Sequence, residues 1–331
     1  MVTSFAELME VQADIAVATL GAHHSAWNKR YEVLPRDDGR VSRVTWDGTI
    51  QYTPEDVVDP LQEMFDRAYL QHDAETLARF REAVRTVLHE NIHLLSGPGT
   101  SLAFPLDDFE GRAHKIFEEA VTERATQNEI GNYIDRLGLE QIAPGISRAP
   151  ASHVYAAYVR AVDVFSETVG ADVGLDSAEV IRRMAVVNSA EKYRVAAELL
   201  YTKHLRHLVP ETAKADAINR IATAMHAPFA AIHGYNGGDP SDVRLAGLAG
   251  RSAYQKADEQ IRSIAEHWSE NQDLRQALDA GLGATTPLHK PHQTKTTDDP
   301  RAEAGDSPQT PTWNAKRPET RQPPPGRSPH D

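Results

Sequence analysis

The segment 74–96 reads AETLARFREAVRTVLHENIHLLS. Its apolar residues recur every three or four positions, which is the spacing of an α-helix with one face in a core. The residues on that face are Leu77, Phe80, Val84, Val87, Leu88 and Leu95. The sequence therefore predicts a helix over about 74–96, and the following Gly97-Pro98-Gly99 predicts its end.

The last turns of this helix carry the pattern H-E-x-x-H at residues 89–93. Side chains four residues apart lie on the same helix face, so His89 and His93 can direct ring nitrogens to one metal ion. Zinc binds such nitrogens at about 2.0–2.1 Å. Glu90 lies one position further round, where its carboxylate can reach a water at the metal without binding the ion. The pattern predicts a zinc site, and a chance match in a His-rich chain is the alternative.

A second predicted helix, over about 114–137, places Glu119 and Glu123 on one face. A catalytic zinc needs three protein ligands and one open position, and Glu119 supplies the third ligand. Glu123 is then left to accept a hydrogen bond from the outer ring N–H of a ligating histidine. Choosing Glu118 as the ligand would put Thr122, a poorer acceptor, in that supporting place. A solvated acidic face on this helix is the other alternative.

The stretch 84–126 resembles the gluzincin group of zinc metallopeptidases, in which H-E-x-x-H is followed some tens of residues later by a helix with a ligand Glu. The match here is Glu119-Ala120-Val121-Thr122-Glu123, with Ala120 where a Gly is common. The resemblance implies a zincin-like catalytic core that hydrolyses peptide bonds, with Glu90 as general base and then acid. It covers only a minor part of the chain.

Strands are predicted at Tyr31–Leu34 and Val41–Tyr52, and the second stretch folds back at Asp47-Gly48. We expect a small antiparallel sheet. In zincins an edge strand pairs with the substrate backbone, and the resemblance makes Thr49–Tyr52 the candidate, with an ordinary hairpin strand as the alternative. An oxyanion stabiliser is also implied, and the candidate is Tyr155, for which core packing is the alternative.

Further helices make the expected fold α+β and mostly helical; they are predicted at about 4–20, 55–72, 152–170, 177–187, 189–207, 210–228 and 252–280. Ten of the 20 prolines lie between Pro287 and Pro329, in a segment too polar to form a core. We therefore expect a zincin-like catalytic domain over 1–174, a helical C-terminal subdomain over 175–284, and a disordered Pro-rich tail over 285–331.

The composition limits which residues can bind a metal ion and which partners the chain can attract. The chain has no cysteine, so a metal ion must be held by His, Asp or Glu. The net charge of −13 does not favour binding to nucleic acid or to an anionic membrane, both of which carry negative charge. Without a bilayer-length apolar run or a basic leader, we expect a cytoplasmic protein.

The function expected from the sequence is that of a zinc metallopeptidase acting on a peptide or protein substrate. A catalytically inactive zincin-like protein that serves as a helical binding or scaffold module is the alternative. In either case, the Pro-rich tail is a candidate binding segment for an unidentified partner.

Overall fold

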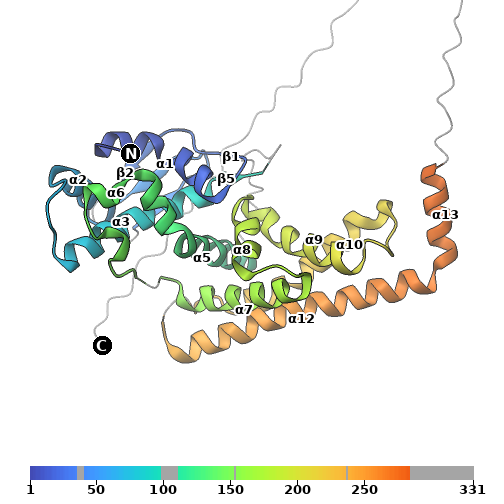
Figure 1. Ribbon diagram of the computed structural model, residues 1–331. Coiled ribbons are helices and arrows are strands. Elements are labelled where there is room, and N and C mark those ends of the chain that lie inside the picture. Colours follow the sequence, from blue (N-terminus) through green and yellow to red (C-terminus); the bar gives the residue numbers. More distant parts are fainter. Residues whose placement is uncertain (36–40, 98–110, 153, 236–237, 284–331) are drawn as a thin grey trace, which may run out of the picture. The chain divides into compact units, whose positions relative to one another are not determined.

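In the computed structural model, the H-E-x-x-H segment lies on helix α3 (Ala74–His93), as the sequence predicts (Figure 1). Asp73 begins the helix by accepting a hydrogen bond from the backbone N–H of Thr76, at 2.8 Å. Every residue from 83 to 92 is buried, so the second half of α3 runs through the interior. The helix ends three residues before the predicted end because Leu95–Ser96 forms a short strand, β5, which pairs with β1 (His24–Ser25).

Two long helices pack against α3, and both follow the predicted segments. Helix α1 (Phe5–Leu20) begins at the capping side chain of Ser4 and ends at Gly21, which has a φ of 69°. Helix α5 (Arg112–Leu137) contacts both α1 and α3. The structure therefore brings together the two helices that carry the predicted ligands.

The small sheet differs from the expected antiparallel one. Strands β3 (Ser42–Val44) and β4 (Ile50–Tyr52) form the predicted hairpin, but β2 (Tyr31–Val33) pairs with β4 in parallel. The strand order is β2-β4-β3. The sheet is therefore mixed.

The expected edge strand at Thr49–Tyr52 is consequently wrong. Strand β4 lies at the centre of the sheet, and both of its backbone edges already pair with neighbouring strands. The side chains of Ile50 and Tyr52 are fully buried, which suits a central strand. In this sheet β3 is an edge strand, and it contacts α3.

Each of the six remaining predicted segments contains helix, but the described residues form nine further α-helices, because the segments 210–228 and 252–280 are each divided and α6 was not predicted. The nine helices are α2 (Asp59–Asp66), which follows a π-helical turn (Pro54–Val58), α6 (Leu139–Ile142), α7 (Ala156–Val173), α8 (Ser177–Ala185), α9 (Lys192–His204), α10 (Lys214–Ala224), α11 (His226–Ala230), α12 (Pro240–Glu270) and α13 (Gln272–Gly283). Short 3₁₀ turns precede α7, α9 and α10.

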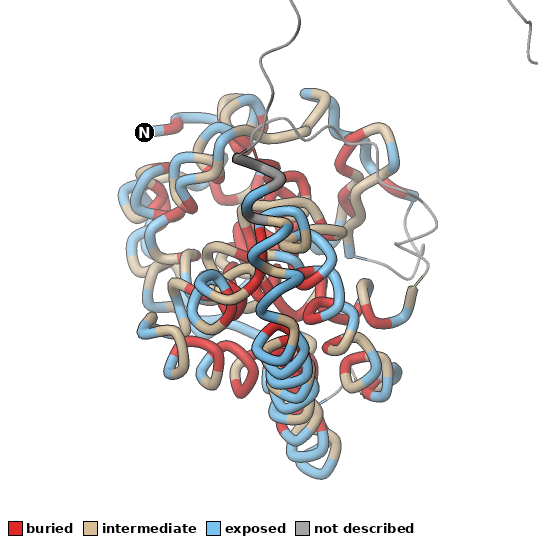
Figure 2. The backbone as a smooth tube through the Cα atoms, turned by 90° about the vertical axis from the view of Figure 1, so that its right-hand side faces the viewer, coloured by how far each residue is buried: buried red, intermediate tan, exposed pale blue. Residues whose placement is uncertain are grey.

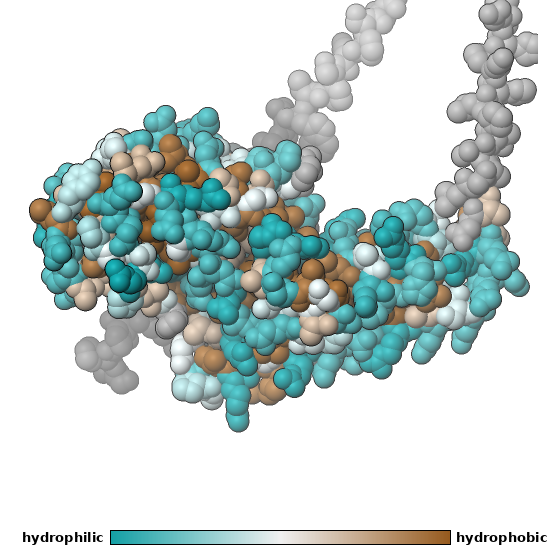
Figure 3. Space-filling model, in the orientation of Figure 1, coloured by the Kyte–Doolittle hydropathy of each residue, from teal (hydrophilic) through white to brown (hydrophobic). Residues whose placement is uncertain are grey.

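Helix α12 buries one face and exposes the other. Its buried residues include Ala246, Gly250, Ala253 and Ala257, which lie at three- and four-residue spacing. That face packs along α7 (Figure 1). Figure 2 shows exposed residues along the outer side of this helix, and Figure 3 shows its surface as mainly hydrophilic.

The structure describes residues 1–35, 41–97, 111–152, 154–235 and 238–283. Met1–Ala284 form one compact unit. The predicted boundary between residues 174 and 175 stays a prediction, and both the predicted tail and Pro98-Gly99 lie outside the described residues. None of the described helices combines the length and the apolar composition that crossing a bilayer requires.

Candidate metal centre

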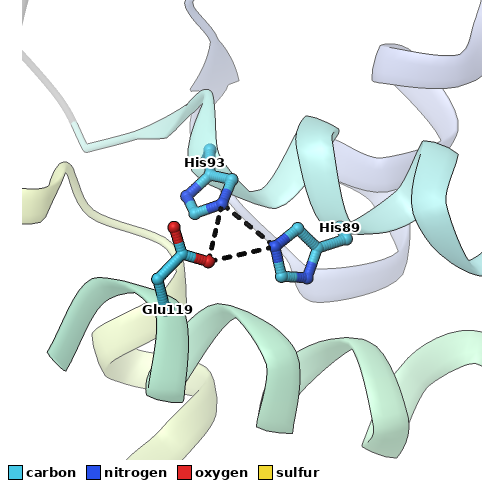
Figure 4. A group of neighbouring side chains, drawn as sticks. All are labelled: His89, His93 and Glu119. Carbon is cyan, nitrogen blue, oxygen red and sulfur yellow. Dashed lines mark hydrogen bonds and ion pairs between the residues drawn. The ribbon is translucent and has the colours of Figure 1, made fainter. Parts of the chain in front are cut away.

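Three side chains from α3 and α5 converge on one point (Figure 4). The Nε2 atoms of His89 and His93 lie 3.1 Å apart. Oε2 of Glu119 lies 3.5 Å from the first of these atoms and 3.8 Å from the second. The centre of the circle through three atoms with these separations is about 2.0 Å from each, which is the bond length that zinc takes with His and carboxylate ligands. This group could therefore hold a metal ion.

The outer nitrogen of each imidazole faces its own carboxylate. Nδ1 of His89 lies 3.1 Å from Oε2 of Glu123, and Nδ1 of His93 lies 2.8 Å from Oε1 of Glu118. A carboxylate accepts hydrogen bonds, so each Nδ1 carries the proton and donates it. The Nε2 lone pairs are then directed inward at Glu119. Three lone pairs that meet in this way require a cation or a proton between them.

Both supporting carboxylates have partners of their own. Arg85 Nη1 lies 2.6 Å from Glu123 Oε2, and the Gln127 side chain donates to Glu123 Oε1 at 2.9 Å. Thr122 Oγ1 donates to Glu118 Oε1 at 3.2 Å, and Lys192 Nζ lies 3.3 Å from Glu118 Oε2. Because these partners fix the carboxylates, they also fix the orientation of the two rings.

The acidic residues of α5 do not form a solvated face. The side chains of Glu118 and Glu123 are 2% and 0% exposed. The alternative with Glu118 as the third ligand also fails, because this carboxylate faces the outer nitrogen of His93. The structure places Glu123 against the outer nitrogen of His89, and its role as the support of a metal ligand stays a prediction.

The site attracts positive charge. Burial opposes protonation of His89, but hydrogen bonds to Glu119 and Glu123 outweigh it and raise the pKa of this imidazole to about 10. Burial likewise opposes ionisation of Glu119, but its hydrogen bond with His89 and the charge of His93 lower its pKa to about 2. A bound cation and a proton would compete for the same lone pairs.

Glu90 lies beside this group and lines a cavity of about 1050 Å³. Its carboxylate is buried and accepts a hydrogen bond from Ser42 Oγ at 2.6 Å. The cavity is also lined by Val41 and by β3, so an edge strand of the described sheet lies at the same space. The site therefore combines a possible ion site with a carboxylate and room for a ligand.

Tyr155 also lines the cavity, immediately before α7. Its ring stacks on that of His89, with centroids 6.3 Å apart and planes 21° apart, and on that of Tyr158 at 5.8 Å. Burial, together with the charge of Glu119, raises the pKa of the Tyr155 phenol, so this hydroxyl stays a neutral donor. The residue both packs and faces the site, and its role as oxyanion stabiliser stays a prediction.

Apart from Glu123, sequence reasoning missed the residues that support the two histidines and Glu90. The roles of Glu118, Ser42 and Lys192 depend on contacts between residues far apart in the chain. Arg85 could have been found, because it lies four residues before His89 and therefore on the same helix face.

Comparison of the chain with protein-family models, with curated proteins and with solved structures found no match. The functional assignment of this site therefore depends on its own residues and their geometry.

Proposed function

We propose that this chain is a zinc-dependent metallopeptidase with a gluzincin-type centre, in which His89, His93 and Glu119 hold the ion. The observation that carries the proposal is the convergence of two Nε2 atoms and one carboxylate oxygen, 3.1 to 3.8 Å apart, beside Glu90. The order of these residues along the chain also matches the gluzincin pattern.

The donor set suits zinc. Two imidazole nitrogens and one carboxylate oxygen form a common ligand set of catalytic zinc sites, and the chain has no thiolate that would favour a closed structural site. A bound zinc ion would polarise the scissile carbonyl and lower the pKa of a water molecule from 15.7 toward about 7.

Glu90 is the proposed proton carrier. Its carboxylate takes a proton from the attacking water as the new carbon–oxygen bond forms, and it returns that proton to the amine nitrogen as the carbon–nitrogen bond breaks. The Ser42 hydroxyl donates to Glu90 and so holds the carboxylate in place. The neutral phenol of Tyr155 is the proposed donor to the carbonyl oxygen as negative charge develops there.

The cavity supports a peptide or protein as the substrate. Its volume of about 1050 Å³ lies just above the usual range for small-molecule sites, and we propose that an extended peptide segment occupies it. We propose that β3, rather than β4, is the strand along which the substrate backbone lies, because β3 combines an edge position with a place in the cavity wall.

The open cavity also distinguishes this proposal from its alternatives. A structural zinc site is closed by four protein ligands, whereas here three ligands face a space lined by a carboxylate. An inactive scaffold would need neither the ion nor Glu90.

The test compares three forms of the protein for zinc content and for cleavage of a peptide library followed by mass spectrometry. The wild type is expected to bind about one equivalent of zinc and to cleave peptides. Glu90→Gln is expected to keep the ion and lose cleavage, and His93→Ala to lose both. A wild type that binds no zinc and cleaves nothing would favour the scaffold, and an active Glu90→Gln variant would overturn the role of Glu90.

A further inference from the structure

A buried lysine from outside α3 and α5 contacts the candidate metal centre. Lys192 is the first residue of α9, and its side chain is 1% exposed. Its Nζ donates hydrogen bonds to the carbonyl oxygens of Met184 and Val187, at 3.3 and 3.2 Å. The same atom lies 3.3 Å from Oε2 of Glu118. Taking an ammonium group out of water is costly, so these three oxygens must compensate for its burial.

Glu118 connects this lysine to the site. One carboxylate oxygen, Oε1, faces His93 Nδ1 and accepts from Thr122. The other, Oε2, is buried and receives no hydrogen bond from the residues that the structure describes. The charge of Lys192 is therefore what compensates the burial of that oxygen and orients the carboxylate.

The other imidazole has a matching arrangement. His89 is held by Glu123, and Glu123 is held by Arg85. Each predicted histidine ligand is thus backed first by a carboxylate and then by a cation. The difference is that Arg85 lies on α3 itself, whereas the cation behind His93 comes from a helix about a hundred residues further along the chain.

We propose that Lys192 is a positioning residue of the metal centre, which acts by holding the Glu118 carboxylate in the orientation that faces His93. This inference depends on the proposed function, since it assumes that His93 binds zinc. It makes α9 a necessary part of the metal site. The catalytic unit then extends beyond residue 174, the predicted end of the catalytic domain.

A purely structural role for Lys192 is the competing explanation. Met184 and Val187 lie at the end of α8, so the ammonium group also satisfies carbonyl oxygens at a helix C-terminus. The two explanations differ in whether the effect of Lys192 passes through Glu118.

The experiment measures Zn²⁺ affinity of the full chain by competition with a chromogenic chelator, and the absorption bands of the Co²⁺-substituted protein. Lys192→Met removes the charge, and Lys192→Gln removes it but keeps a donor for the α8 carbonyls. Each change is made alone and together with Glu118→Gln. The matched control is Tyr193→Phe, which removes a neighbouring buried contact of α9, the hydrogen bond to Ala113 O at 3.1 Å.

Either change at Lys192 is expected to weaken Zn²⁺ binding by about 10-fold, which is the lower end of the effect of mutating groups that support metal ligands. Either change should also shift the Co²⁺ absorption bands. In the Glu118→Gln background the same change should lower Zn²⁺ affinity by less than about twofold, because the interaction of Lys192 with the Glu118 carboxylate is already lost. Tyr193→Phe should leave both measurements unchanged. Lys192→Gln decides the matter should Lys192→Met fail to fold.

Two results would overturn the proposal. One is Zn²⁺ affinity and Co²⁺ bands for Lys192→Gln that match those of the wild type. The other is an equal loss of affinity with and without Glu118→Gln, which would assign Lys192 to the support of α8 alone. A wild type that binds no Zn²⁺ would instead remove the proposed function on which this inference depends.

Discussion

Two helix pairs of this protein, α3–α5 and α7–α12, differ in the kind of residue that they bury between them. Between α3 and α5 the facing residues include imidazoles and carboxylates, buried and connected in chains. Between α7 and α12 the buried residues of α12 include the small Ala246, Gly247, Gly250 and Ala253, and at Gly250 the backbones come so close that a Cβ would lie 2.0 Å from Ala161 O. The second pair gains stability from close packing, whereas the first gives up stability to keep a polar site in the interior.

The two helix pairs differ in their need for a bound cation. Carboxylates outnumber the lysine and arginine cations around the imidazoles: Arg85, Lys115 and Lys192 lie among five acidic side chains, those of Glu82, Glu90, Glu118, Glu119 and Glu123. Such a cluster is stable only when its charges are compensated. A divalent ion would supply the missing charge at α3–α5, and nothing comparable is needed at α7–α12.

The largest expected effect is stabilisation by zinc. Free Zn²⁺ at about 1,000 times its dissociation constant should raise the free energy of unfolding by about 4 kcal/mol, because the folded site binds the ion. Chemical denaturation with and without Zn²⁺ measures this difference. His93→Ala is the control and should lose the effect. An equal gain in His93→Ala would place the ion elsewhere.

A substitution in the other helix pair should change stability without changing the site. Gly250→Ala forces the backbones of α7 and α12 apart and should lower the free energy of unfolding by about 2 kcal/mol, even after the helix-propensity gain from alanine. Zn²⁺ affinity should stay within about twofold of the wild type.

The matched control for that prediction is Gly247→Ala on the same helix. The atoms nearest to a Cβ at this position belong to the Arg160 and Val164 side chains, at 3.4 Å or more. It should be tolerated or stabilising by up to about 1 kcal/mol. Similar losses from both alanines would mean that the close approach at Gly250 is not what limits the packing.

The smallest expected effect is a pH dependence that zinc removes. The pKa of His89 is raised from 6.5 to about 10, so its contribution to metal-free stability is complete below pH 6.5 and is lost as pH rises toward 10. Glu119, lowered from 4.5 to about 2, contributes above pH 4.5 and loses its contribution as pH falls toward 2.

Metal-free protein should accordingly lose about 1 kcal/mol of stability between pH 7 and pH 8, given about 1.4 kcal/mol per pH unit for one proton. Zinc-saturated protein should show no such loss, because the ion replaces the proton at His89. Denaturation curves at the two pH values test this. Parallel pH dependence in both forms would contradict it.

The sequence could predict the centre of the site but not its surroundings. Helical periodicity fixes where side chains four residues apart lie, so the pairing of His89 with His93 and the face shared by Glu119 and Glu123 follow from spacing alone. The rotation of α5 about its axis does not follow from spacing, and it is this rotation that turns Glu118 toward His93.

The wrong prediction of an edge strand at Thr49–Tyr52 also depends on contacts between distant residues. A hairpin at Asp47-Gly48 can be predicted from local turn chemistry, but whether another strand pairs with its far side depends on residues outside the hairpin. Here β2 occupies that side of β4. Helix α12 begins at Pro240, well before the predicted start at about residue 252, and its Gly250 serves close packing against α7.

A crystal structure of the zinc-loaded protein, with anomalous scattering recorded at the zinc absorption edge, tests the central claim most directly. The predicted result is one strong peak within about 2.0–2.2 Å of Nε2 of His89, Nε2 of His93 and a carboxylate oxygen of Glu119. A zinc peak elsewhere, or none at this point with the Glu119 carboxylate turned away from the histidines, would contradict it.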